Sequence, residues 1–156
     1  AESPAPLLVF DGLRGANEVA YAAATLPLAR FVMLDAPDVV RLQRLLGRGD
    51  AFDRIQVTNT SNHDATSFAA LGLAEASTIF NAAEEATILS WLQHGIVTSD
   101  ELRAKLQIVI EERRSYDPVA THDALRAHAP HSTLYIDTVS HGPTAVAKQT
   151  IAWLNL

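Results

Sequence analysis

Two residue types in this sequence stand where they could bind a phosphorylated ligand. Asp11 and Asp137 each follow directly after a short apolar run, and a carboxylate in such a place can orient a hydrated Mg²⁺. Arg14, Arg44 and Arg48 supply guanidinium groups, which can hold a phosphate through two parallel hydrogen bonds. The residue types therefore favour a site for a small anion, built from aspartate and arginine.

The same residues also fit structural roles. An aspartate after a strand often caps the next turn or helix, and Asp35 is expected to cap the helix that follows it. For Asp11 both capping and ligand binding stay open. Arg41, Arg44 and Arg48 lie toward the end of a predicted helix, where cations on a solvated face interact favourably with the helix dipole. An anion site and a solvated helix face are therefore both open for these arginines.

Three short apolar runs predict the strands that would position these side chains. They cover residues 7–10, 31–34 and 133–136, and continuous apolar runs of this length are typical of strands buried on both faces of a parallel sheet. Apolar residues at helical spacing predict a helix after each run. These helices are expected at about residues 16–26, at about residues 36–46, and from Pro143 onward.

The order of these elements predicts where a ligand would bind. In an open α/β sheet, ligands bind beyond the carboxyl ends of the parallel strands. We therefore expect Asp11, Gly12, Arg14 and Asp137 to lie along one edge of the sheet.

The central part of the chain predicts a helical insertion. Residues 50–63 are polar and irregular, and helices are expected over residues 69–92, from the capping box at Thr98 to about Arg114, and shortly after Pro118. The prediction is one α/β domain over residues 1–156, a three-layer parallel sheet with residues 50–130 inserted as helices.

Three motifs in order resemble P-loop kinases. Residues 9–14, Val-Phe-Asp-Gly-Leu-Arg, are similar to a strand segment of nucleoside monophosphate kinases and of proteins related to dephospho-coenzyme A kinase. Residues 34–37, Leu-Asp-Ala-Pro, are similar to the end of the next strand in such proteins. Residues 44–48, Arg-Leu-Leu-Gly-Arg, resemble the Arg-Leu-x-Gly-Arg helix end of adenylate-kinase-like enzymes. The resemblance implies an incomplete P-loop kinase-like fold.

The resemblance also implies roles for these residues. Arg44 would lie over the adenine and Arg48 would reach a phosphate, while Arg14 would bind the acceptor phosphate beside Gly12. Asp11 would be the catalytic carboxylate on the metal side, and the strand ending at Asp137 would lie beside the base. ATP and Mg²⁺ are the cofactors implied, with a small anionic nucleotide-like ligand.

One essential part of a P-loop kinase is missing from these residues. The phosphate-binding loop needs Gly-x-x-x-x-Gly-Lys, and this sequence contains no Gly-Lys pair. Phosphotransferase activity is therefore expected only if a missing N-terminal segment or a partner supplies that loop. The interpretation is a nucleotide- or phosphate-binding domain that is inactive alone. The alternative is a non-catalytic binding or assembly module whose helical insertion forms a homodimer or partner surface.

Composition excludes several other functions. A formal charge of −6 and a pI near 5.4 disfavour nucleic-acid binding, which depends on basic residues. The sequence has no cysteine and no apolar run near the ~20 residues that span a bilayer, so no disulfide and no membrane contact are expected, and the cytoplasm is the default location. His63-Asp64 and His122-Asp123 are similar to the His-Asp pairs of metal-dependent phosphohydrolases, so a hydrolase of that kind is a third alternative. Such sites need further His and Asp ligands on facing helices, and no metal site is assigned.

Overall fold

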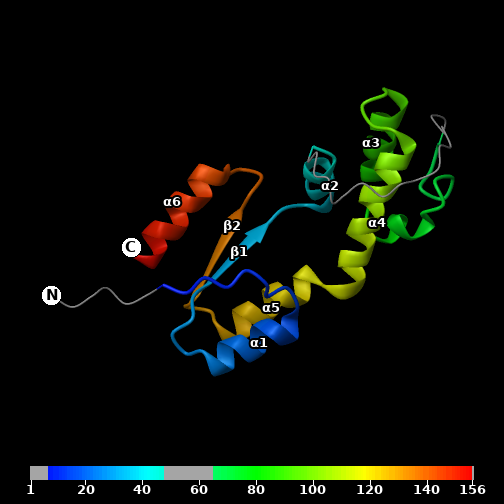
Figure 1. Ribbon diagram of the computed structural model, residues 1–156. Coiled ribbons are helices and arrows are strands. Elements are labelled where there is room, and N and C mark those ends of the chain that lie inside the picture. Colours follow the sequence, from blue (N-terminus) through cyan, green and yellow to red (C-terminus); the bar gives the residue numbers. More distant parts are fainter. Residues whose placement is uncertain (1–6, 48–64, 156) are drawn as a thin grey trace. The chain divides into compact units, whose positions relative to one another are not determined.

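The computed structural model describes residues 7–47 and 65–155 (Figure 1). It is a mixed α/β structure with a small parallel sheet. In chain order the elements are α1 (Ala16–Thr25), β1 (Phe31–Asp35), α2 (Asp38–Leu46), the 3₁₀ helix η2 (Ala74–Thr78), α3 (Ala82–Gln93), α4 (Ser99–Ser115), α5 (Pro118–His128), β2 (Thr133–Asp137) and α6 (Pro143–Leu154). Most of the predicted helices and two of the predicted strands are therefore confirmed.

The two strands pair in parallel. The Phe31 amide donates to the Ser132 carbonyl, and the Thr138 amide donates to the Asp35 carbonyl. In a parallel ladder these two bonds place Phe31 opposite Thr133 and Asp35 opposite Asp137. The two aspartates are thus neighbours at the carboxyl end of the sheet, on the same face.

The first predicted strand is wrong. Residues 7–10 form neither helix nor strand, and all four side chains are exposed. A strand needs a neighbour to accept its backbone hydrogen bonds, and the described sheet contains β1 and β2 only. An apolar run indicates a preference for strand, but it does not show whether an adjacent strand is present to pair with it. Asp11 therefore does not stand at the end of a strand.

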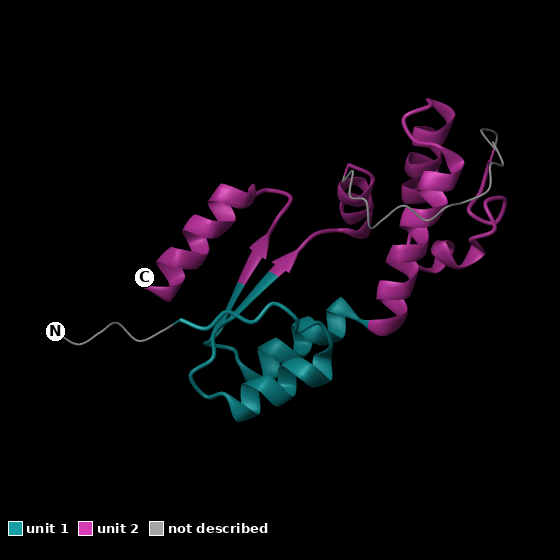
Figure 2. Ribbon diagram, viewed as in Figure 1, with its two compact units in different colours: residues 1–33, 116–134 teal, residues 34–115, 135–156 magenta. Residues whose placement is uncertain are grey.

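The chain divides into two compact units (Figure 2). In unit 1, residues 1–33 and 116–134, α1 packs against α5. Val19 and Ala22 of α1 and Leu125 of α5 are buried, as expected for two amphipathic helices in contact. The Thr121 hydroxyl donates to the Arg14 carbonyl at 2.8 Å, which attaches the start of α1 to α5.

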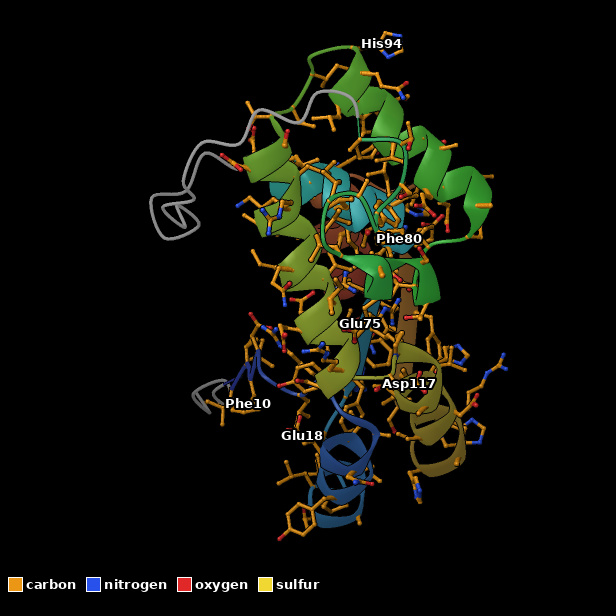
Figure 3. The ribbon with its side chains drawn as sticks, turned by 90° about the vertical axis from the view of Figure 1, so that its right-hand side faces the viewer. Phe10, Glu18, Glu75, Phe80, His94 and Asp117 are labelled. Carbon is orange, nitrogen blue, oxygen red and sulfur yellow. The ribbon has the colours of Figure 1, made fainter. Side chains whose placement is uncertain are left out.

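Unit 2, residues 34–115 and 135–156, holds a continuous apolar core. The rings of Phe68 and Phe80 lie 5.8 Å apart in a tilted contact, and Phe80 points into this core (Figure 3). The core also includes fully buried residues of α2, α3 and α4, namely Leu42, Ile88, Leu92, Leu102, Leu106 and Val109. These helices place their apolar sides together, as their sequence periodicity predicts.

Capping residues explain where several helices begin. The Asn81 side chain accepts from the Ala83 and Glu84 amides at α3, and the Thr98 hydroxyl accepts from the Glu101 amide at α4, as its capping box predicts. Asp117 caps α5 in the same way. The predicted cap at Asp35 is wrong, because the chain stays extended to Pro37 and Pro37 precedes α2 without a side-chain hydrogen bond.

No helix in the described ranges combines the length and apolar character that crossing a membrane requires.

Candidate functional site

The carboxyl ends of β1 and β2 form the candidate site. Asp35 ends β1, Asp137 ends β2, and Thr138 follows directly. The Thr138 hydroxyl donates to the Asp35 carbonyl at 2.9 Å, and the Thr138 amide donates to the same oxygen. Both strand ends are therefore fixed to each other at the edge where α/β sheets bind ligands.

Arg44 reaches this edge from α2. Its Nη1 donates to the Thr138 hydroxyl at 2.8 Å and its Nη2 donates to the Thr138 carbonyl at 2.5 Å. The side chain is exposed and lies in the last turn of α2. Two hydrogen bonds to one residue hold the guanidinium plane in a fixed orientation beside the strand ends.

The partners of Arg44 differ in charge from those of Arg41, one helical turn earlier. Arg41 forms ion pairs with Asp38 and Glu112, so its positive charge is compensated. The Arg44 contacts go to a hydroxyl and a carbonyl, both of which are neutral. Arg44 therefore presents an exposed, oriented positive charge, which suits the binding of an anion.

The turn after β2 is ordered by Asp137. Its carboxylate accepts from the Ser140 hydroxyl at 2.5 Å and from the Val139 amide at 2.8 Å. These two hydrogen bonds, the Ser140 bond first, lower the pKa of Asp137, and His141 adds a smaller favourable charge interaction. The Asp137 carboxylate thus fixes the turn that carries Thr138, the residue that orients Arg44.

The remaining predicted residues belong to unit 1 or lie outside the described ranges. Asp11, Gly12 and Arg14 belong to unit 1, in an irregular segment before α1 where Asp11 and Arg14 are exposed. The Arg14 amide donates to Glu18 at 3.0 Å, and this bond, followed by one from the Gly15 amide, lowers the pKa of Glu18. Arg48 lies outside the described residues. A shared site of these residues with Arg44 stays a prediction.

Sequence reasoning missed Thr138, which contacts both Arg44 and Asp35. The available signal was weak, because a threonine after a strand is common and Arg44 is 94 positions away. In the His122–Asp123 pair, His122 is half-buried and Asp123 is exposed, with Nδ1 3.8 Å from Oδ1. Residues 63 and 64 lie outside the described ranges. Within residues 7–47 and 65–155, no group of three or more His, Cys, Asp or Glu side chains is arranged to hold a metal.

Comparison of the chain with protein-family models, with curated proteins and with solved structures found no match.

Proposed function

We propose that this chain is a phosphate- or nucleotide-binding domain related to small-molecule kinases. The observation that carries the proposal is the Arg44 guanidinium, exposed and held by neutral partners at the carboxyl edge of a parallel sheet. An anion that binds there adds the opposite charge that the Thr138 contacts do not supply. A nucleotide phosphate suits a guanidinium in this place, because it offers several oxygens to one planar donor group.

The resemblance of residues 9–14, 34–37 and 44–48 to P-loop kinases supports a nucleotide as the ligand. On this proposal the two strands are part of an incomplete three-layer kinase-like sheet. Phosphoryl transfer needs a glycine-rich loop that wraps the phosphates, and a Gly-Lys pair is missing from this sequence. The chain alone is then a binding domain, and ATP and Mg²⁺ would be used only when another segment or partner supplies the loop.

Calorimetric titration tests this proposal. ATP and a nucleoside monophosphate are titrated into the wild-type chain, into Arg44→Ala and into Lys148→Ala. The control removes one positive charge from an exposed position of α6. We expect wild-type binding with a dissociation constant of about 1 mM or tighter, which corresponds to about 4 kcal/mol or more. Arg44→Ala should abolish the heat, and Lys148→Ala should keep it.

Two results would contradict the proposal. If the wild type gives no heat with either nucleotide, the chain does not bind nucleotides. If Arg44→Ala and Lys148→Ala lose binding equally, binding depends on net charge and not on the position of Arg44.

Arg14→Ala is a further variant, because the family resemblance assigns Arg14 to the acceptor phosphate. Its binding of the monophosphate should weaken if that assignment holds.

A further inference from the structure

Residues 7–10 form an exposed apolar segment. Leu7, Leu8, Val9 and Phe10 are 58%, 91%, 77% and 74% exposed. The segment has no charged residue, and its Val-Phe pair favours a strand. Four consecutive exposed apolar side chains on a folded chain mark an interaction surface. The segment therefore has the composition of a buried strand without the neighbour that a buried strand requires.

The outer edge of β1, which faces away from β2, lacks a paired strand in the described part of the chain. The hydrogen bonds at Phe31 and Asp35 direct the backbone groups of Phe31, Met33 and Asp35 toward β2. Because the backbone alternates, the amides and carbonyls of Val32 and Leu34 point to the opposite edge. In the described part of the chain, no third strand pairs with β1. That edge is open to an added strand.

Side-chain burial shows which side of the sheet lacks cover. Leu34 of β1 and Ile136 of β2 are opposite each other on one face of the sheet, as the register requires. Ile136 is 1% exposed, whereas Leu34 is 56% exposed. The packing that buries Ile136 of β2 on this face therefore does not extend over Leu34 of β1. A strand added beyond β1 would place its own side chains beside Leu34 and would give the parallel sheet the burial that such sheets normally have.

We propose that residues 7–10 of one copy of this chain add as a strand to the outer edge of β1 in a second copy. Each copy carries both the missing strand and the open edge, so the exchange is reciprocal and closes as a two-fold dimer. Residues 7–10 and 31–34 carry no charged side chain, so the −6 charge of each copy does not oppose the contact of these residues directly. This proposal goes beyond nucleotide binding and does not depend on Arg44.

Light scattering of the purified full chain tests the proposal. The wild type should have twice the monomer mass of 16.9 kDa. Leu8→Asp places a charge in the added strand and should raise the dimer dissociation constant at least about tenfold. Leu28→Asp is the matched control, because Leu28 is 94% exposed and lies outside the segment. Leu28→Asp should leave the dimer intact.

A second pair of samples tests the acceptor edge. Val32→Pro removes an amide that points away from β2 and should also give monomers, since proline is tolerated at a strand edge but cannot donate. Mixing Leu8→Asp with Val32→Pro should restore a dimer. The Val32→Pro copy still has an intact segment 7–10, and the Leu8→Asp copy still has an intact β1 edge, so one of the two strand contacts can form. A monomeric wild type would overturn the proposal. So would equal behaviour of Leu8→Asp and Leu28→Asp, or a mixture that stays monomeric.

Discussion

The helical part of unit 2 and the strand pair differ in how completely they are buried. In the helical part, Phe68, Leu92, Leu102 and Leu106 are fully buried around one core. In the strand pair, Ile136 alone is buried, and Leu34 and Tyr135 are 56% and 38% exposed. Helix α6 has no buried residue.

This difference shows where stability and binding are expected to lie. Burial of apolar side chains is the dominant favourable contribution to folding, so the helical core should hold most of the stability of unit 2. The strand pair contributes little burial, but it positions Arg44, Thr138 and the Asp137 turn. Unpaired edges and exposed apolar side chains are typical of surfaces that bind a ligand or another chain.

Removing a core ring should have the largest effect and tests the comparison directly. Phe80→Ala deletes a side chain that is 2% exposed and contacts Phe68, so it should lower the free energy of unfolding by about 3–5 kcal/mol. Ile151→Ala, on α6 at 50% exposure, should cost about 1 kcal/mol or less. Denaturant unfolding measures both. Equal losses would mean that α6 is as important for stability as the core.

Removing the ion pairs of Asp38, one within α2 and one to α4, should have the next largest effect. Asp38 is 12% exposed in its side chain and pairs with Arg41 and Arg113. Asp38→Ala leaves two partly buried guanidinium groups without this carboxylate and should cost about 1–2 kcal/mol of unfolding free energy. Glu75→Ala removes an exposed pair with Arg114 and serves as the control, with little expected change. A larger loss in Glu75→Ala would contradict the burial argument.

The turn after β2 should depend on pH. The hydrogen bonds from Ser140 and Val139 lower the pKa of Asp137 in the folded chain. Their stabilisation is therefore present above the unfolded pKa and is lost as the pH falls through the folded pKa. The protection of the Val139 amide against hydrogen exchange should fall when the pH drops below the ordinary pKa range of an aspartate. The exchange rates are compared after correction for the intrinsic effect of pH on an unprotected amide. Asp137→Asn should remove that dependence, and an unchanged profile in this variant would rule out the Asp137 carboxylate as its cause.

A new helix cap should have the smallest effect. Gly142 precedes α6 without a side-chain cap, and a Cβ there would meet no atom within 4 Å. Gly142→Ser can supply an acceptor for the first amides and should stabilise α6 by about 0.3 kcal/mol. Asn81→Gly, which removes the cap of α3, should cost a similar amount. Amide exchange in each helix separates the two effects, and a loss of protection in Gly142→Ser would contradict this expectation.

The local sequence pattern predicted the helices and strands better than it predicted the tertiary contacts around them. The strands at residues 31–34 and 133–136 and the helix after Thr98 follow from apolar spacing and capping residues, so the sequence identified them. The exposure of residues 7–10 was not predictable, because a strand requires a distant neighbour.

The candidate site was predicted only in part for the same reason. Arg41 and Arg44 look alike in sequence, but Arg41 is compensated by Glu112 of α4, whereas Arg44 contacts Thr138. These long-range contacts depend on the packing of α4 and on the register of β2. The helix that carries both arginines was predictable from the sequence, but the difference between them was not.

Nuclear magnetic resonance titration with ADP tests the central claim most directly, because it locates the ligand as well as detecting it. The account predicts that the amide signals of Thr138 and Val139 shift with increasing ADP in the wild type and in Lys148→Ala, and that these shifts vanish in Arg44→Ala. Saturable shifts that map to other residues, or that persist unchanged in Arg44→Ala, would contradict the assignment of the anion site to the carboxyl edge of the sheet.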